Sequence, residues 1–274
     1  MTIGMSRSWD SMSTKGLLRT LPDKIVVQSE SIKNQAIEYH SIDREKIFVT
    51  GTPHYDAYLT EKRIPRREFF HKLGLDPEKK MIFLTLPSDI WTGDKLLNPH
   101  LLSLFSKLDE QIVVRFPIFG PVDIGGFQPP KNMVFDTPEM KGKLEESFLS
   151  KKDDDRLADL IYHSEVVVTG PSSIILDAAV LDRPSVLIGF DGERKKIYSQ
   201  TLARYYDYEH QQAVINMGAL KIAKTGEELL NFVKEYLRNP NLDKENRKSV
   251  ARSVCPNLDG KSGERMAKLI FGSI

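Results

Sequence analysis

This sequence of 274 residues has only one cysteine, almost no excess of either charge and no long apolar run. Its single cysteine, Cys255, excludes an internal disulfide and fits a reducing compartment. The 39 Lys and Arg residues nearly balance the 38 Asp and Glu residues, so the basic excess typical of nucleic-acid-binding proteins is missing. No apolar stretch approaches the roughly 20 residues that span a bilayer, and residues 1–10 have no apolar core of signal-peptide type. We therefore expect a soluble, cytoplasmic protein without a nucleic-acid partner.

What the chain does contain is an alternation of short β-branched runs with amphipathic segments. The runs predict strands at 24–28, 46–50, 81–86, 111–115, 132–135, 165–169 and 185–188. Helices are predicted from residue 30 and at 66–73, 101–108, 155–163, 172–181, 226–238, 243–253 and 263–271. Apolar strands that alternate with helices indicate an α/β fold, with a Rossmann-like parallel sheet covered by helices on both faces.

The composition changes between about Glu61 and Glu78, where charged residues and prolines accumulate. This change divides the chain into a partial N-terminal Rossmann-like segment at 1–65, a linker at 66–79 and a C-terminal Rossmann-like domain at 80–274. About 60 residues are too few for a complete doubly wound domain. We therefore expect either a chain that begins at an internal methionine or a protein whose first domain is naturally reduced.

The loop Gly170-Pro171-Ser172-Ser173 follows the predicted strand 165–169 and opens the next helix. Ligands of open α/β sheets bind beyond the carboxyl ends of the strands, and the unpaired amides and dipole of a helix start attract anions. Asp177 follows about one helical turn later, where a carboxylate suits the hydroxyls of a ribose. The same residues also fit an ordinary helix cap at Ser172 and a surface carboxylate at Asp177.

The segments around this loop, 159–173 and 177–186, resemble the donor-site core of GT-B fold transferases. An acidic and apolar helix leads to a strand, a Gly/Ser turn and a helix with an acidic residue, and Pro184 then leads into the next strand. The most similar family is that of the CDP-glycerol glycerophosphotransferase-like proteins of surface-polysaccharide synthesis. The same layout occurs in the peptidoglycan N-acetylglucosaminyl transferase and in non-hydrolysing UDP-N-acetylglucosamine 2-epimerases. By this resemblance Ser172 and Ser173 hold a diphosphate.

Two earlier parts of the chain extend the resemblance, which runs from about Ser6 to Gly192. Residues 8–27 look like the late part of the first domain in related proteins, and 47–56 look like the strand and turn that close it. The resemblance implies a donor of the UDP or CDP type and a polysaccharide or lipid-linked acceptor. We expect no cofactor or metal to be required, because the helix dipole and Arg115 can compensate the charge of the diphosphate.

Arg115 stands in the run Val113-Val114-Arg115-Phe116-Pro117, where related transferases often have a basic residue followed by His-Pro. Here Phe116 replaces the histidine, so any role that needs an imidazole at this position is in doubt. Arg115 can still pair with a phosphate in bidentate geometry. A surface charge at the strand end explains it equally well.

His54 and Asp10 are the candidate catalytic residues. His54 follows the turn Gly51-Thr52-Pro53 near the expected cleft between the domains, and its ordinary pKa near neutrality suits a general base. Capping of a helix is the simpler role for such a histidine. Asp10, beside Trp9, can bind acceptor hydroxyls or simply end a strand.

These observations predict the transfer of a glycosyl or glycerol-phosphate group from a nucleoside diphosphate donor to a hydroxyl of a cell-surface polysaccharide or glycolipid. The alternatives are a non-hydrolysing sugar-nucleotide 2-epimerase and a non-catalytic nucleotide-binding remnant. The short first domain favours the non-catalytic remnant. The region Arg63–Lys72 places basic residues beside Phe69 and Phe70, which suits peripheral contact with the inner face of the membrane, although a solvated linker fits as well.

Overall fold

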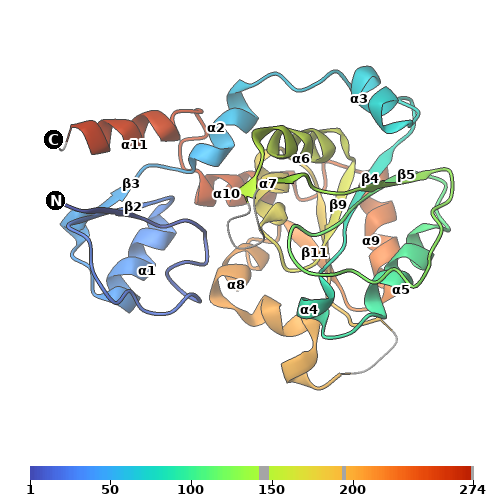
Figure 1. Ribbon diagram of the computed structural model, residues 1–274, viewed down its shortest axis with the longest axis horizontal. Helices are drawn as coiled ribbons and strands as arrows, with labels where there is room; N and C mark the ends of the chain where they lie inside the picture. Colours follow the sequence, from blue (N-terminus) through green and yellow to red (C-terminus); the bar gives the residue numbers. More distant parts are fainter. Residues whose placement is uncertain (142–147, 193–195, 273–274) are drawn as a thin grey trace.

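The computed structural model describes residues 1–141, 148–192 and 196–272, and Figure 1 shows two α/β units of unequal size side by side. The smaller unit has a parallel three-stranded sheet in the order β1 (Ile3–Met5), β2 (Lys24–Val27) and β3 (Ile47–Val49). Helix α1 (Glu30–His40) packs on this sheet, and Ser29 caps it by accepting a hydrogen bond from the Ile32 amide. The core of this unit is small and includes Ile25, Val27 and Ala36.

The larger unit is built on a six-stranded sheet in the order β11-β10-β9-β4-β5-β6, and every pairing in it is parallel. Its strands are β4 (Met81–Thr85), β5 (Gln111–Arg115), β6 (Met133–Asp136), β9 (Val166–Thr169), β10 (Ser185–Ile188) and β11 (Leu220–Ala223). A separate antiparallel pair is formed by β7 (Met140–Lys141) and β8 (Phe148–Leu149). The four central strands are buried along their whole length, as expected for a parallel sheet covered on both faces.

Helices α5 and α9 cover one face of this sheet, and α3, α6 and α7 cover the other. In chain order, the helices after α1 are α2 (Pro53–Thr60), α3 (Arg66–Leu73), α4 (Asp89–Thr92), α5 (Leu97–Phe105), α6 (Lys151–His163), α7 (Ile174–Val180), α8 (Glu209–Ile215), α9 (Gly226–Arg238), α10 (Lys244–Val254) and α11 (Ser262–Phe271). The 3-10 helices are η1 (Arg44–Lys46), η2 (Tyr198–Gln200) and η3 (Leu202–Asp207). None of these helices combines the length and apolar character needed to cross a membrane, within the part of the chain that is described.

Alternate side chains of each central strand point to opposite faces of the sheet, and each set joins a different core. Ile82 and Leu84 of β4 belong to the core formed with α5 and α9, whereas Met81 and Phe83 belong to the core formed with α3, α6 and α7. The expected fold class is therefore confirmed. The division into 1–65, 66–79 and 80–274 stays a prediction.

Helix α3 corrects the expectation of a membrane-contacting segment. Phe69 and Phe70 are only 2% and 0% exposed, because they pack into the core shared with β4 and α6. The guanidinium of Arg66 donates to the carbonyl oxygens of Pro77, His163 and Lys79, which ties α3 to its surroundings. The aromatic part of the predicted membrane contact is wrong, since buried rings cannot enter a lipid surface.

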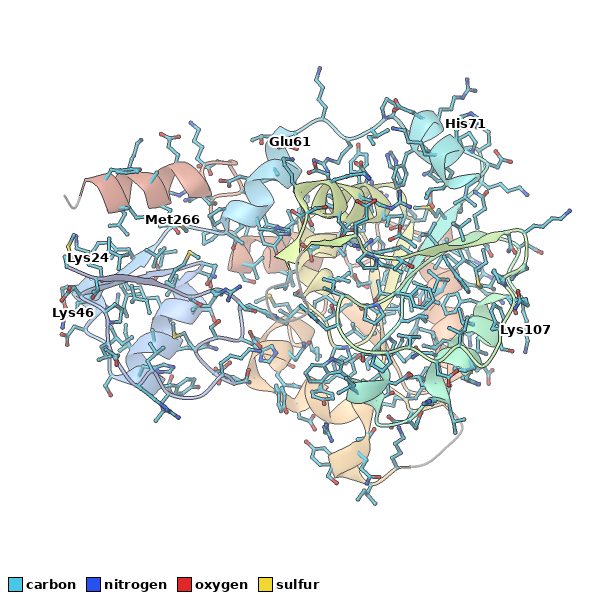
Figure 2. The ribbon with its side chains drawn as sticks, viewed as in Figure 1. Lys24, Lys46, Glu61, His71, Lys107 and Met266 are labelled. Carbon is cyan, nitrogen blue, oxygen red and sulfur yellow. The ribbon has the colours of Figure 1, made fainter. Side chains whose placement is uncertain are left out.

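The C-terminal helix α11 returns to the smaller unit, and Figure 1 shows it beside α2 and above the sheet of β2 and β3. Met266, labelled in Figure 2, marks its middle. The Asp56 carboxylate of α2 accepts from the backbone amides of Ser262 (3.0 Å) and Gly263 (2.7 Å), which start α11. Gly51 has a positive φ of 86°, and a Cβ there would lie 2.5 Å from the Ser262 hydroxyl. The turn before α2 is thus shaped to receive α11.

Candidate functional site

A cavity of about 910 Å³ lies where the two units meet, at the carboxyl ends of β4, β5 and β9. The chain passes from β4 to β5 and β6 on one side and later places β9 on the other side of β4, so this is the point where the strand order reverses. Such a switch point is the usual ligand crevice of an open α/β sheet. Residues 8–10 and His54 line the cavity opposite the strand ends.

The floor of the cavity is held by a hydrogen bond between the two strand ends. The Thr85 hydroxyl of β4 donates to the Thr169 hydroxyl of β9 at 2.7 Å, and both side chains are buried. The loop Gly170-Pro171-Ser172-Ser173 follows β9 and lines the cavity over its whole length, as predicted from its place after the strand. The Ser172 hydroxyl accepts from the Ile174 amide at 3.3 Å, so it also opens helix α7. A diphosphate role for this loop stays a prediction.

His54 lies between two carboxylates. Its Nε2 is 3.0 Å from Asp177 Oδ1 and its Nδ1 is 3.3 Å from Asp154 Oδ2, which ties the start of α2 to α7 and α6. Burial alone would lower the pKa of His54, but the hydrogen bonds to Asp154 and Asp177 and their charges outweigh it and raise the pKa to about 10. An imidazolium that donates from both nitrogens has no lone pair for a proton. The arrangement therefore argues against the expected role of His54 as a general base.

Asp177 lines the cavity but is only 5% exposed, and one of its oxygens is the partner of His54. From the sequence, Asp177 is predicted to contact a ribose. Its contact with His54, which lies 123 positions earlier in the chain, was not predicted. The contact shows that the carboxylate has a structural role in joining α2 to α7. Contact with a ribose stays a prediction.

Arg115 also lines the cavity, yet its guanidinium is taken up by two carboxylates. One nitrogen pairs with Asp136, its neighbour across the β5–β6 ladder, and another pairs with Asp153 of α6. Arg115 is 3% exposed and both acids are 2% exposed, so this is a buried ion-pair cluster. The interpretation of Arg115 as a surface charge at the strand end is wrong, because Arg115 is buried. Direct pairing with a phosphate stays a prediction, and any phosphate would compete with Asp136 and Asp153 for the guanidinium.

Asp10 enters the cavity from the smaller unit. Its Oδ2 is 3.1 Å from the Lys15 ammonium. Burial raises the pKa of Asp10, but hydrogen bonds from Ser8 and Lys15 and the charge of Lys15 outweigh it and lower the pKa below its ordinary value. Asp10 is therefore ionised at neutral pH and can accept a proton or a hydroxyl hydrogen bond.

Trp9, His210 and Gln211 also line the cavity. None of the three was predicted from the sequence as a ligand-binding residue. The Trp9 ring of the smaller unit meets the His210 ring of α8 edge to face, with centroids 4.6 Å apart. The aromatic stretch Arg204–Tyr208 just before α8 was the available signal. It did not reveal that α8 faces Trp9, because that contact depends on how the two units dock.

Comparison with known proteins gives a family and a fold. A family model described as CDP-Glycerol:Poly(glycerophosphate) glycerophosphotransferase matches residues 135–272, half of the chain. The teichoic acid poly(ribitol-phosphate) polymerase of Bacillus spizizenii (strain ATCC 23059 / NRRL B-14472 / W23) is 22% identical over 257 residues. The match covers 90% of this chain and 37% of the polymerase. The chain thus spans well under half of that relative.

Among solved structures, the wall teichoic acid polymerase TagF is similar with a TM-score of 0.58 and 18% identity, covering 92% of this chain and 58% of that one. A TagF variant combined with CDPG gives a TM-score of 0.59 at 17% identity, with the same two shares covered. The UDP-GlcNAc 2-epimerase of Methanocaldococcus jannaschii, with UDP-GlcNAc and UDP, gives 0.57 at 17% identity and covers 92% and 61%. At these identities the structures support the fold, which is of the GT-B type.

Proposed function

Since this chain belongs to the CDP-glycerol:poly(glycerophosphate) glycerophosphotransferase family, we propose that it transfers a glycerol-phosphate unit from CDP-glycerol to a hydroxyl of a cell-surface polymer. The observation that carries the proposal is a cavity in which the loop 170–173 of one unit faces Asp10 of the other. A donor and an acceptor can meet there, at the switch point of the sheet. We place the activity in the cytoplasm, because the lone, buried Cys255 fits a reducing compartment.

In the proposed reaction the acceptor hydroxyl oxygen forms a bond to the phosphorus that carries glycerol. The bond from that phosphorus to the bridging oxygen of the diphosphate breaks, and its electron pair leaves with CMP. The hydroxyl proton passes to the carboxylate of Asp10, which is ionised and has one unpaired oxygen in the part of the chain that is described. With a sugar-nucleotide donor the same attack would occur at the anomeric carbon, and the nucleoside diphosphate would leave.

Each other residue of the site has a separate task in this proposal. The hydroxyls of Ser172 and Ser173 donate to the diphosphate, where negative charge grows as the leaving group departs. The His54 imidazolium supplies positive charge beside the same cavity and fixes Asp177 in place. Arg115 has a positioning role, since its guanidinium pairs with Asp153 and holds the start of α6 against the sheet.

The donor site is tested by calorimetric titration of the full chain with CDP, UDP, GDP and inorganic phosphate, with and without Mg²⁺. We expect CDP to bind, and the double change Ser172→Ala and Ser173→Ala to weaken it by about 1–3 kcal/mol through loss of two hydroxyl donors. The matched control replaces Ser103 and Ser199, two exposed serines outside the cavity, by Ala. Equal CDP affinity in the double variant and the control would contradict the role of the loop.

A 2-epimerase is the second candidate, favoured by the similarity of fold to the epimerase structures. That reaction would interconvert the 2-epimers of a UDP-sugar without an acceptor. Incubation with UDP-N-acetylglucosamine, followed by NMR of the anomeric region, separates it from transfer. Appearance of the 2-epimer would replace our proposal, whereas CDP binding without any turnover of CDP-glycerol would favour a non-catalytic remnant.

A further inference from the structure

One end of the cavity is lined by aromatic rings from both units. Trp9 meets His210 at 4.6 Å between ring centroids, and Tyr208 lies 5.9 Å from His210 and 5.7 Å from Tyr205. The position of α8 is fixed from the smaller unit, because the Glu209 carboxylate accepts from Gln35 (3.0 Å) and from the Tyr39 hydroxyl (2.8 Å). These contacts hold the rings in a defined arrangement.

Three polar atoms at this end of the cavity are buried without a hydrogen-bond partner among the described residues: Asp10 Oδ1, His210 Nδ1 and Gln211 Oε1. The side chains of His210 and Gln211 are more than nine-tenths buried, at 8% and 4% exposed. A buried polar atom without a partner costs stability, so such atoms call for an explanation. Two of the three are oxygens that only accept hydrogen bonds, and a group rich in hydroxyl donors would satisfy them.

The charges here do not suit a phosphate. Of the described lining residues, Lys15 and His210 are the basic ones beside these three atoms, and Lys15 pairs with Asp10. Burial lowers the pKa of His210, which keeps its ring neutral near pH 7. An acceptor chain carrying phosphates would meet the unpaired oxygens of Asp10 and Gln211 and no uncommitted cation beside them among the described residues.

We propose that this end of the cavity is an acceptor subsite for an uncharged sugar ring. The ring hydroxyls donate to Asp10 Oδ1 and Gln211 Oε1, and its C–H face packs on the rings of Trp9 and Tyr208. The assignment of this sugar as the acceptor rests on the transfer reaction proposed above. The sugar hydroxyl that contacts Asp10 is then the one that receives the transferred group.

The test is saturation-transfer NMR on the full chain in the presence of CDP, with methyl N-acetyl-β-glucosaminide and sn-glycerol 3-phosphate as the two probes. We expect the sugar to bind, and Gln211→Leu to weaken it roughly tenfold by removing one acceptor. Gln211→Leu should also keep or raise the melting temperature, because it removes an unsatisfied buried oxygen. Gln200→Leu, at an exposed glutamine outside the cavity, is the matched control and should change neither.

Each outcome has a distinct meaning. Absence of a sugar signal from the wild-type protein, or glycerol 3-phosphate binding that depends on Gln211, would overturn the subsite. A Gln211→Leu variant that loses stability and CDP affinity together would show a structural or nucleobase-binding residue instead. Tyr208→Leu, at a 43% exposed ring, gives a second measure of sugar affinity that does not depend on core packing. If CDP fails to bind while the sugar binds, the transfer reaction fails and the sugar site stands.

Discussion

A buried arginine lies between two buried acids at the end of β5. Removing Arg115, Asp136 and Asp153 from water costs free energy, which their mutual attraction offsets only when every member keeps its partner. Arg156 adds a further contact to Asp136 from the surface side. The cluster therefore fixes the relative positions of β5, β6 and α6, and residues of β5 and α6 line the cavity.

His54 makes stability depend on pH in a predictable direction. Its folded pKa of about 10 lies above its ordinary value of 6.5, so its contribution is complete below about pH 6.5 and is lost as pH rises through 10. We expect the urea midpoint of the wild-type protein to fall more steeply between pH 6.5 and 10 than that of His54→Gln. His71→Gln, at an exposed histidine of α3, should keep the wild-type slope. Parallel curves for wild type and His54→Gln would show that the two ion pairs contribute nothing in solution.

At the scale of elements, local patterns located the buried strands well. The runs 81–86, 111–115 and 185–188 are apolar and β-branched, and β4, β5 and β10 lie there. The strand β11 escaped prediction because Lys221 interrupts its apolar run and three of its four residues are only half-buried. Helix α2 escaped because Pro53 was interpreted as part of a turn, although proline is well suited to the first position of a helix.

The predicted helix 101–108 is shifted from the observed α5, Leu97–Phe105. Pro99 lies in the first turn of α5, where a missing backbone N–H has no helical partner to lose. The buried residues Leu97 and Leu101 hold this turn in the core. Tertiary packing therefore set the start of the helix four residues earlier than the apolar pattern alone suggested.

Asp56 caps α11 across a long stretch of chain, and its removal should destabilise the protein. Asp56→Ala leaves the amides of Ser262 and Gly263 without their acceptor, with an expected loss of about 1–2 kcal/mol in the free energy of unfolding. Glu264→Ala is the matched control, because Glu264 is an acid in the first turn of α11 that pairs with Lys268 on the surface. Urea unfolding measures both, and equal losses would mean that only the helix dipole matters.

At the scale of the whole molecule, the candidate site divides into a part that the sequence could reveal and a part that it could not. The loop 170–173 is local, because a strand end, a glycine and a helix start follow one another in the chain. Trp9 and His210 are about 200 positions apart, and nothing in either segment specifies that they meet. The same holds for His54 with Asp177, since both contacts arise only when the smaller unit docks on the larger one.

We expect the smaller unit to depend on that docking for its stability. Its core has few buried residues, and a three-stranded sheet with one helix buries little apolar surface. The contacts of α11 with α2 and of Glu209 with Gln35 and Tyr39 therefore contribute to holding it folded. Loss of one docking contact should loosen this unit before it affects the six-stranded sheet.

Glu209→Ala tests this dependence. The change leaves Gln35 and Tyr39 without their shared acceptor, so we expect faster hydrogen exchange for amides of α1, β2 and β3 and unchanged exchange for β9 and β10. Glu227→Ala, at an exposed acid of α9, is the control and should leave both units as in the wild type. Equal protection of the smaller unit in the two variants would mean that its stability comes from its own core and α11.

CDP affinity should persist in Glu209→Ala, because the loop 170–173 belongs to the larger unit, whereas turnover should fall as Asp10 and Trp9 leave the cavity more often.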